Sequence, residues 1–404
     1  MIQILAKMNS FKNNSFQSPK SIFLFGLFFA FVITLKEVIN LSFNNFQIFY
    51  FGSIDFWGDI NPYSSWNHLN LRGSFLDVFI YLPLFSILFT PFTLLPIHIG
   101  AFCWNFFTYY LFFSAIFNLP NQFKNKRFIF FIACLLLFAT MLSMQFNPIV
   151  VALFLFSYTL LEKRQSFLAI LLISISGFTK VYGIFQLSML MFYPKFWKNS
   201  LYTICIAILL FFLPIIRFNF TELISYYQSW INAISKHSRM QDFYSIYRAV
   251  YSITPEINSY ASKISFIVLF LIIILGILNA KRFKQSFALR AQYLGILMSY
   301  GILFGLSSEL HTYVIAMVGY AVWYIYNKKT KLDTILLWIN FFLLAVFPID
   351  IFCPLIISKF ILGKLHLGVI VFFITWLVMV YKTFKGRVYL ASPYDKMNNN
   401  ISIG

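Results

Sequence analysis

Charged residues are scarce in this sequence. Asp, Glu, Lys and Arg make up 11% of its 404 residues, whereas hydrophobic residues make up 60%. A soluble globular domain usually carries about 25% charged residues, so the composition excludes an ordinary soluble protein. Nearly every apolar side chain must face lipid or another helix, which predicts an all-α polytopic membrane protein.

Cysteine is also rare. The four cysteines lie within apolar segments and lack the CxxC spacing of a zinc site, so we expect packing residues rather than metal ligands or a disulfide framework. The sequence contains neither a P-loop nor a nucleotide-binding fingerprint. This excludes an ordinary ATP-driven pump, and no cofactor is expected.

Acidic residues are few as well: there are 12, against 31 Lys and Arg, and the net charge is +19. Such an excess could indicate a nucleic-acid partner, but the positive residues are scattered through short loops instead of forming one basic face. We interpret them as cytoplasmic anchors that contact anionic lipid headgroups. Membrane lipids, and no nucleic acid, are therefore expected as partners.

Long apolar runs, in contrast, are abundant. A helix needs about 20 residues to cross roughly 30 Å of hydrocarbon, and somewhat fewer when it is short or deeply seated. By this rule the sequence predicts about twelve crossings, with both termini on one side. The predicted crossings are Ser21–Val38, Ile99–Phe117, Phe128–Leu142, Ile149–Leu161, Phe167–Phe178, Val181–Tyr193, Leu201–Ile216, Ile264–Ala280, Ala291–Leu306, Thr312–Tyr326, Thr334–Phe347 and His366–Tyr381.

The distribution of charge orients these crossings. Positively charged loops stay in the cytoplasm, and the Lys and Arg clusters all fall on one side of the predicted topology. Residues 1–20 are therefore a cytoplasmic segment, 21–387 the transmembrane domain and 388–404 a cytoplasmic tail. Most carboxylates sort to the outer side: Asp55, Asp59, Asp77, Glu222, Asp242, Glu256, Glu309 and Asp350.

Two outer segments are long. Residues 39–98 form a first outer loop followed by a kinked segment, and residues 217–263 form a large outer loop. Within the first, residues 77–96 are apolar but contain three prolines, which remove backbone donors and break helices. We predict a kinked or re-entrant element there, because such breaks persist only where protein or water satisfies the freed carbonyls.

Lys180 is the clearest ionisable candidate, because it interrupts an apolar stretch from Phe167 to Tyr193. An ammonium in hydrocarbon costs at least about 2.5 to 3.5 kcal/mol. Two short apolar arms joined at Lys180 would form a hairpin whose tip reaches the outer side. The lysine could bind a phosphate there, or it could simply extend from a helix end to the interface.

Other candidates lie at outer-side junctions. Glu309 and His311 could bind a polar substrate or accept a proton, or they could belong to a solvated turn. In the large outer loop Lys236, His237 and Arg239 could grip a phosphate. Carboxylates, cations and aromatic rings on one face suit the transfer of a group from a phosphate-activated lipid.

Several motifs then resemble one family. They are "FIYLPLFSILFTPFTLLPIHIGAFCWNFF" at 79–107, Asn61-Pro62-Tyr63, Gln145-Phe146-Asn147, "FLAILLISISGFTK" at 167–180 and Ser308–Tyr313. Over residues 40–320 the chain resembles the family 87 membrane glycosyltransferases of the GT-C superfamily, formerly a domain of unknown function. Residues 192–198 and 225–238 resemble a branch found in Bacteroidetes-type bacteria.

The resemblance implies a metal-independent, cofactor-free enzyme of the bacterial inner membrane whose active site faces the periplasm. It would move a hexose, often mannose, from a polyprenyl-phosphate sugar to a lipid-linked or cell-envelope acceptor, and a single displacement would invert the anomeric carbon. Lys180 matches the family lysine and would hold the donor phosphate. His311 matches the family histidine. The substrate contact expected for Asn147 rests on its position and chemistry.

The chain departs from the family at the general base. The position of the family aspartate is occupied by Asn45, and an amide cannot accept the proton. Asp55 and Asp59, which share a face if they lie on one helix, or Asp77 could replace it. If none does, the protein could be a non-catalytic binder of lipid-linked sugars. A flippase or exporter of such lipids is the other alternative.

Overall fold

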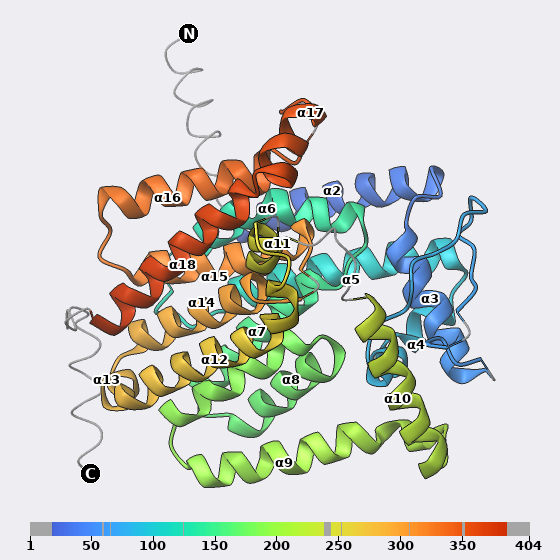
Figure 1. The fold of residues 1–404 in the computed structure, drawn as a ribbon, viewed down its shortest axis with the longest axis horizontal. Helices are drawn as coiled ribbons and strands as arrows, with labels where there is room; N and C mark the ends of the chain where they lie inside the picture. Colours follow the sequence, from blue (N-terminus) through green and yellow to red (C-terminus); the bar gives the residue numbers. More distant parts are fainter. Residues whose placement is uncertain are drawn as a thin grey trace.

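A computed structural model describes residues 18–58, 60–64, 66–123, 125–237, 244–251, 253–306, 308–349 and 352–385. These residues fold into helices joined by loops (Figure 1), which confirms the predicted all-α architecture. In the first half the helices are α2 (Pro19–Ile39), α3 (Asn44–Trp57), α4 (Pro83–Thr93), α5 (Ile97–Phe117), α6 (Lys126–Leu142), α7 (Asn147–Glu162), α8 (Ser166–Thr179) and the 3-10 helix η1 (Val181–Phe192).

The second half continues in the same way. Its elements are α9 (Phe196–Phe212), η2 (Leu213–Ile216), α10 (Phe220–His237), α11 (Ile246–Tyr251), α12 (Ile257–Leu278), α13 (Ala280–Gln285), α14 (Phe287–Leu303), η3 (Leu310–Thr312), α15 (Tyr313–Tyr326), α16 (Lys331–Phe341), η4 (Phe342–Val346), α17 (Leu355–Ser358), η5 (Lys359–Lys364) and α18 (Leu367–Lys385).

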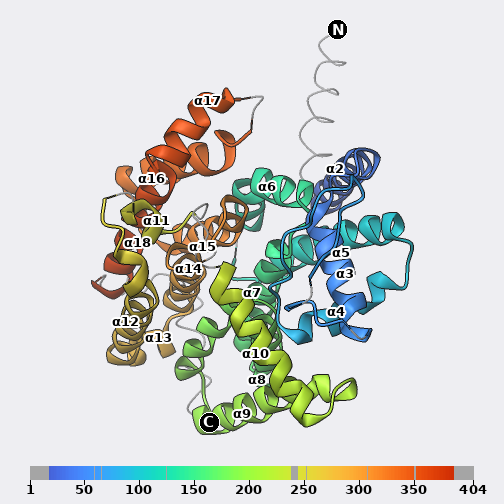
Figure 2. The same cartoon turned by 45° about the vertical axis from the view of Figure 1, so that its right-hand side comes forward.

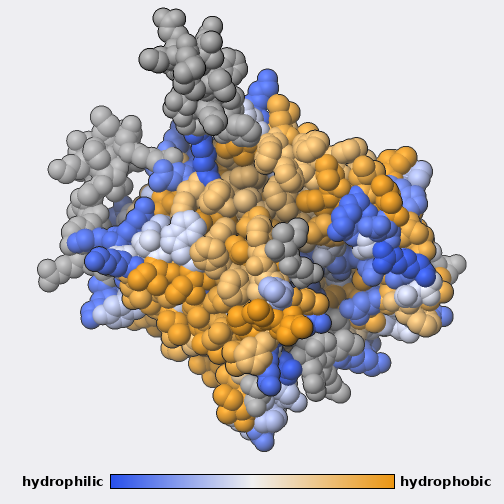
Figure 3. Space-filling model, turned by 90° about the horizontal axis from the view of Figure 1, so that it is seen from above, coloured by the Kyte–Doolittle hydropathy of each residue, from blue (hydrophilic) through white to orange (hydrophobic). Residues whose placement is uncertain are grey.

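The long helices identify a membrane protein. Within the described residues, five helical stretches are long and apolar enough to cross a bilayer: Pro19–Ile39, Ile97–Phe117, Phe196–Ile216, Ser259–Leu278 and Leu367–Lys385. Shorter apolar helices, among them α7, α8 and η1, lie between them. Most of the surface in Figure 3 is hydrophobic, and hydrophilic residues gather toward the left and right edges and at the bottom of the view. The total of about twelve crossings stays a prediction.

Two groups of helices lie on opposite sides of the molecule. Figure 2 shows α2–α5 on one side and α12–α18 on the other, with α6 and α7 between them, in contact with both. The closest pair is α14 with α15, whose residues are largely buried. A Cβ added to Gly295 would lie 2.3 Å from the carbonyl oxygen of Gly319, so glycine at both positions lets the two backbones touch.

Helix α8 and the 3-10 helix η1 form a helical hairpin whose turn is at Lys180. The chain turns back there, and Gly183 of η1 packs directly against Ser176 of α8. The other end of η1 returns to α7, where the Tyr193 hydroxyl donates to Glu162 Oε1 at 2.6 Å. The predicted pair of short apolar arms joined at Lys180 is therefore present, and its tip lies away from Glu162.

Helices α3 and α10 lie at one end of the molecule, on the right in Figure 1, which we call the α3 end. The stretch 44–57, predicted as part of a loop, is helix α3. Arg217 caps it, donating to the carbonyl oxygens of Trp57 and Gly58 at 3.2 and 2.8 Å. These contacts satisfy carbonyls that a helix leaves free at its C-terminus.

The kinked segment follows. Residues 77–82 belong to neither a helix nor a strand. Pro83 begins the 11-residue helix α4, and Pro91 lies inside that helix. Pro96 then precedes the first residue of α5. An α-helix of 11 residues spans about 16 Å, roughly half the bilayer core, so α4 alone is too short to cross it.

Candidate functional site

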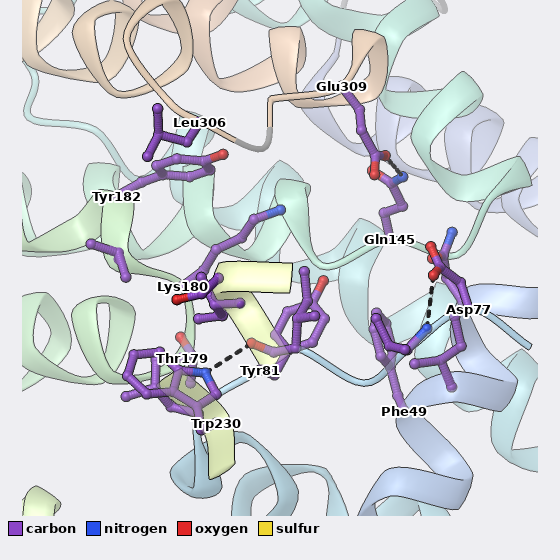
Figure 4. Close-up of a pocket in the computed structure, with 18 residues that line it drawn as sticks. Phe49, Asp77, Tyr81, Gln145, Thr179, Lys180, Tyr182, Trp230, Leu306 and Glu309 are labelled. Carbon is purple, nitrogen blue, oxygen red and sulfur yellow. Dashed lines mark hydrogen bonds between the residues drawn. The ribbon is translucent and has the colours of Figure 1, made fainter. Parts of the chain in front are cut away.

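A cavity of about 320 Å³ lies at the α3 end, where the first outer segment meets the Lys180 hairpin and α10 (Figure 4). Its walls combine polar, charged and aromatic side chains from distant parts of the sequence. The lining residues are Asn45, Ile48, Phe49, Asp77, Val78, Ile80, Tyr81, Leu82, Gln145, Thr179, Lys180, Val181, Tyr182, Trp230, Ile234, Ser235, Leu306 and Glu309.

Lys180 provides the positive charge in this cavity wall. It caps the C-terminus of α8 in an extended conformation, between two apolar helices and outside both. Its Nζ donates to Asn147 Oδ1 at 2.6 Å and lies 5.4 Å from the centre of the Tyr182 ring. Burial lowers the pKa of the ammonium to about 8, although the Glu309 carboxylate opposes this shift.

A chain of hydrogen bonds connects Lys180 to a carboxylate. Asn147, which accepts from Lys180, donates its own amide to Gln145 Oε1. Gln145 in turn donates to Glu309 Oε2 at 2.7 Å (Figure 4). Every bond in the chain is donated in the direction from the cation to the carboxylate, so the two amides connect the opposite charges and keep them apart.

Asp77 adds a second carboxylate. It follows directly after a short hairpin, and its Oδ1 accepts from the Val78 amide at 2.8 Å. The residue is exposed, so its carboxylate can reach a ligand. In Figure 4, Asp77 lies on the same side of the cavity as Gln145 and Phe49, and the Lys180 side chain extends from the other side.

Asn45 also lines the cavity, from α3. Its amide donates to the carbonyl oxygen of Ser143 at 2.8 Å. The hydroxyl of the same serine lies 3.4 Å from His311 Nε2. Asn45, at the position of the family aspartate, and His311, the predicted histidine, therefore both contact Ser143. His311 itself is not among the described lining residues.

Aromatic rings form another wall. The Trp230 indole N–H of α10 donates to the Ile80 carbonyl oxygen at 3.0 Å, which joins α10 to the first outer segment. Tyr81, Tyr182 and the buried Phe49 complete the ring wall. Phe49 and Tyr182 are buried, whereas Trp230 and Tyr81 are partly exposed and can offer ring faces to a ligand.

Asp55 lies elsewhere on α3. Only 3% of the residue is exposed, and its Oδ2 lies 2.8 Å from Nε2 of His68. Burial raises the pKa of this carboxyl, and the hydrogen bond and charge of His68 oppose the rise. Asp55 is not among the described residues that line the cavity.

The remaining predicted residues are placed in different ways. Lys236 is exposed on α10, directly after the lining residue Ser235. His237 ends that helix, and its side chain lies outside the description. Asp59 and Arg239 fall outside the described residues, so the structure does not place them.

Sequence reasoning missed Gln145 as a site residue, although the Gln145-Phe146-Asn147 motif contained it. A stronger signal was its spacing of two from Asn147, just before the start of α7, which lets the two amides bond to each other. Trp230 and Tyr81 were also missed as ring-wall residues, because aromatic rings are common at any membrane interface.

Among the described residues, no three His, Cys, Asp or Glu side chains lie close enough to hold a metal ion.

The sequence model of glycosyltransferase family 87 matches residues 79–348, which is more than half of the chain. The match contains most of the cavity wall, including Lys180 and Glu309, and begins just after Asp77. A search of curated proteins found no match.

Proposed function

Because the chain belongs to glycosyltransferase family 87, we propose that it transfers a hexose from a polyprenyl-phosphate sugar to a lipid-linked or cell-envelope acceptor. The observation that carries this proposal is one cavity with a lysine, two carboxylates and a wall of rings. These are the groups needed to hold a phosphate, deprotonate a hydroxyl and stack a sugar. In this proposal the cavity faces the periplasm and both termini are cytoplasmic.

Lys180 is the donor-phosphate residue. Its charge is desolvated, which strengthens its attraction to an anion, and its partner Asn147 is neutral, so no carboxylate within the described residues competes at ion-pair distance. During transfer the bond between the anomeric carbon and the phosphate oxygen breaks. The electron pair stays on the phosphate, and the ammonium stabilises the charge that accumulates there.

Asp77 is the general base, because it is the described aspartate of the first outer segment that lines the cavity. It accepts the proton of the acceptor hydroxyl as that oxygen forms its bond to the anomeric carbon. Attack opposite to the leaving phosphate inverts the configuration. Glu309 and His311 then bind substrate hydroxyls. The predicted substrate residue Asn147 is fully buried and instead holds Lys180 in place. Asn45 donates to Ser143 and does not act as a base.

The experiment is transfer of radiolabelled sugar from a set of polyprenyl-phosphate sugars to endogenous lipid, in membranes that contain the wild type or Asp77→Asn. General-base catalysis contributes about 10²- to 10⁴-fold, so Asp77→Asn should lose transfer by that factor at unchanged protein level and donor binding. The matched control is Glu222→Gln on α10, an exposed carboxylate that accepts from the backbone N–H of Asn219; it should transfer normally.

Two results would contradict the proposal in different ways. Full transfer by Asp77→Asn would remove Asp77 as the base and leave the transferase in place. Lack of transfer by the wild type with every donor, together with retained binding of lipid-linked sugar, would favour the flippase or the non-catalytic binder.

A further inference from the structure

Asp77 is the first residue after a short hairpin, residues 68–76. The Leu76 amide donates to the His68 carbonyl oxygen at 2.9 Å, and Leu69 pairs with Phe75. Gly73 makes the turn with φ of +82°, a conformation that favours glycine. The hairpin thus fixes the backbone that leads into the cavity.

The hairpin is anchored on α3 by side chains that the reaction does not use. At its base His68 bonds to Asp55, and the imidazole also stacks on the Phe51 ring, 4.8 Å away at an interplanar angle of 7°. Nearer the turn, the Leu71 amide donates to Gln47 Oε1 at 2.9 Å. The α3 partners in these two bonds, Asp55 and Gln47, are both buried, which limits the access of water to them.

The Leu76 peptide groups are held from two directions. Its N–H is bonded to the His68 carbonyl, and its carbonyl oxygen accepts from the Trp66 indole at 3.3 Å. The Trp66 and His68 rings contact each other edge to face, with centroids 4.8 Å apart. A shift of the His68 ring would therefore move both bonds that locate Leu76, and Asp77 is the next residue.

We propose that Asp55 and His68 are positioning residues that hold Asp77 at the cavity through the hairpin 68–76; this rests on the proposed role of Asp77. Helix α3 suits this function because it also carries the cavity residues Asn45 and Phe49. Asp55 joins the hairpin to α3, the helix that also forms part of the cavity wall. One rigid helix therefore sets the distance between Asp77 and that wall.

This role accounts for the placement of Asp55 better than base catalysis. A general base must come within hydrogen-bond reach of the proton that it accepts. The Asp55 carboxylate is buried with His68, away from the described cavity lining. A buried, hydrogen-bonded carboxylate that orients an imidazole is instead a means of fixing a ring and the backbone attached to it.

The test is steady-state kinetics of purified, folded protein with a polyprenyl-phosphate sugar for Asp55→Asn and His68→Phe. The second variant keeps a ring to stack on Phe51 and removes only the bond to Asp55. Misplacement by about 1 Å can cost 10²-fold, so we expect kcat to fall about 10- to 100-fold in each variant. The donor KM should stay within about twofold, because Lys180 is on another element.

Two comparisons separate positioning from general destabilisation. In the double variant Asp55→Asn/Asp77→Asn, transfer should be no slower than in Asp77→Asn alone, because the positioned group is already gone. The matched control is Asp333→Asn, which changes another buried aspartate; it lies on α16, is paired with Lys382 at 2.7 Å and is not among the cavity-lining residues. It should lower the unfolding temperature without changing kcat of the folded protein.

The outcomes distinguish the inference from the proposed function. If Asp77→Asn loses transfer but Asp55→Asn and His68→Phe keep the wild-type kcat, the positioning role is overturned and the function stands. A further loss in the double variant would also overturn it, since Asp55 would then act independently of Asp77. Full transfer by Asp77→Asn would overturn the base assignment and this inference together.

Discussion

Two partly buried cations of this protein lie in opposite surroundings. Arg290 of α14 meets the Glu162 carboxylate with two nitrogens, at 2.7 and 2.8 Å, and lies over the Tyr193 ring. Lys180 donates to the neutral Asn147 amide and faces the cavity. One cation is neutralised by the fold, and the other has its charge separated from Glu309 by two amides.

If the proposed function holds, charge serves structure at Arg290 and ligand binding at Lys180. A bidentate ion pair fixes three elements to each other, because Glu162 is on α7, Arg290 on α14 and Tyr193 directly after η1. The Lys180 chain leaves positive and negative ends exposed to the same cavity. A phosphate can approach the first end, and hydroxyl groups can approach the second.

Breaking the Arg290 pair should have the largest effect on stability. Arg290→Ala leaves the Glu162 charge without its partner in a buried site, which typically costs about 3 to 5 kcal/mol. The unfolding temperature of purified protein in detergent should fall by many degrees. Arg127→Ala, at an exposed arginine on α6, is the control. Equal unfolding temperatures for the two variants would show that the pair adds nothing to stability.

Removing the cavity cation should reverse this pattern, with little effect on stability and a clear effect on the donor. Hydrogen bonds to charged groups contribute about 1.5 to 3 kcal/mol, so Lys180→Ala should lower kcat/KM for the donor about 10- to 150-fold. Lys198→Ala, at an exposed lysine on α9, should retain the wild-type value. A large fall in unfolding temperature with unchanged donor kinetics would mean that Lys180 is structural, like Arg290.

The pH dependence of kcat/KM for the donor tests the same contrast and is expected to give the smallest effect. Because the pKa of Lys180 is lowered to about 8, the ammonium loses its proton as the pH rises through that value. The donor kcat/KM, which reports the free enzyme, should then fall about tenfold per pH unit. Lys180→Arg should not show this fall below pH 10, since arginine stays charged. An identical fall in both proteins would assign it to another group.

The sequence predicted this contrast only in part. Lys180 stood out because it interrupts an apolar stretch, and the structure has a helix break there. Glu309 was predicted at another outer-side junction, together with His311, and nothing in the sequence placed it next to Lys180. Gln145, which joins Glu309 to the chain from Lys180, lies 164 residues away from Glu309, and no local pattern specifies a hydrogen bond over that separation.

The choice among the aspartates depended on the same long-range information. Asp55 and Asp77 both lie in the predicted first outer segment, and composition gives each an equal claim to be the base. What separates them is the pairing of Asp55 with His68, across 13 residues, and the hairpin that leads to the cavity. Local helix and turn preferences do not specify that tertiary pairing.

The short arms of the Lys180 hairpin also constrain how the protein is made. A 14-residue α-helix spans about 21 Å and a 12-residue 3-10 helix about 24 Å, for α8 and η1 respectively, and each is shorter than the roughly 30 Å of a bilayer core. Neither arm should be stably released into lipid by itself during synthesis. We therefore expect the hairpin to settle late, after α14 has emerged from the ribosome and packs against η1. The proposed phosphate site at Lys180 would then form only after α14 has been made.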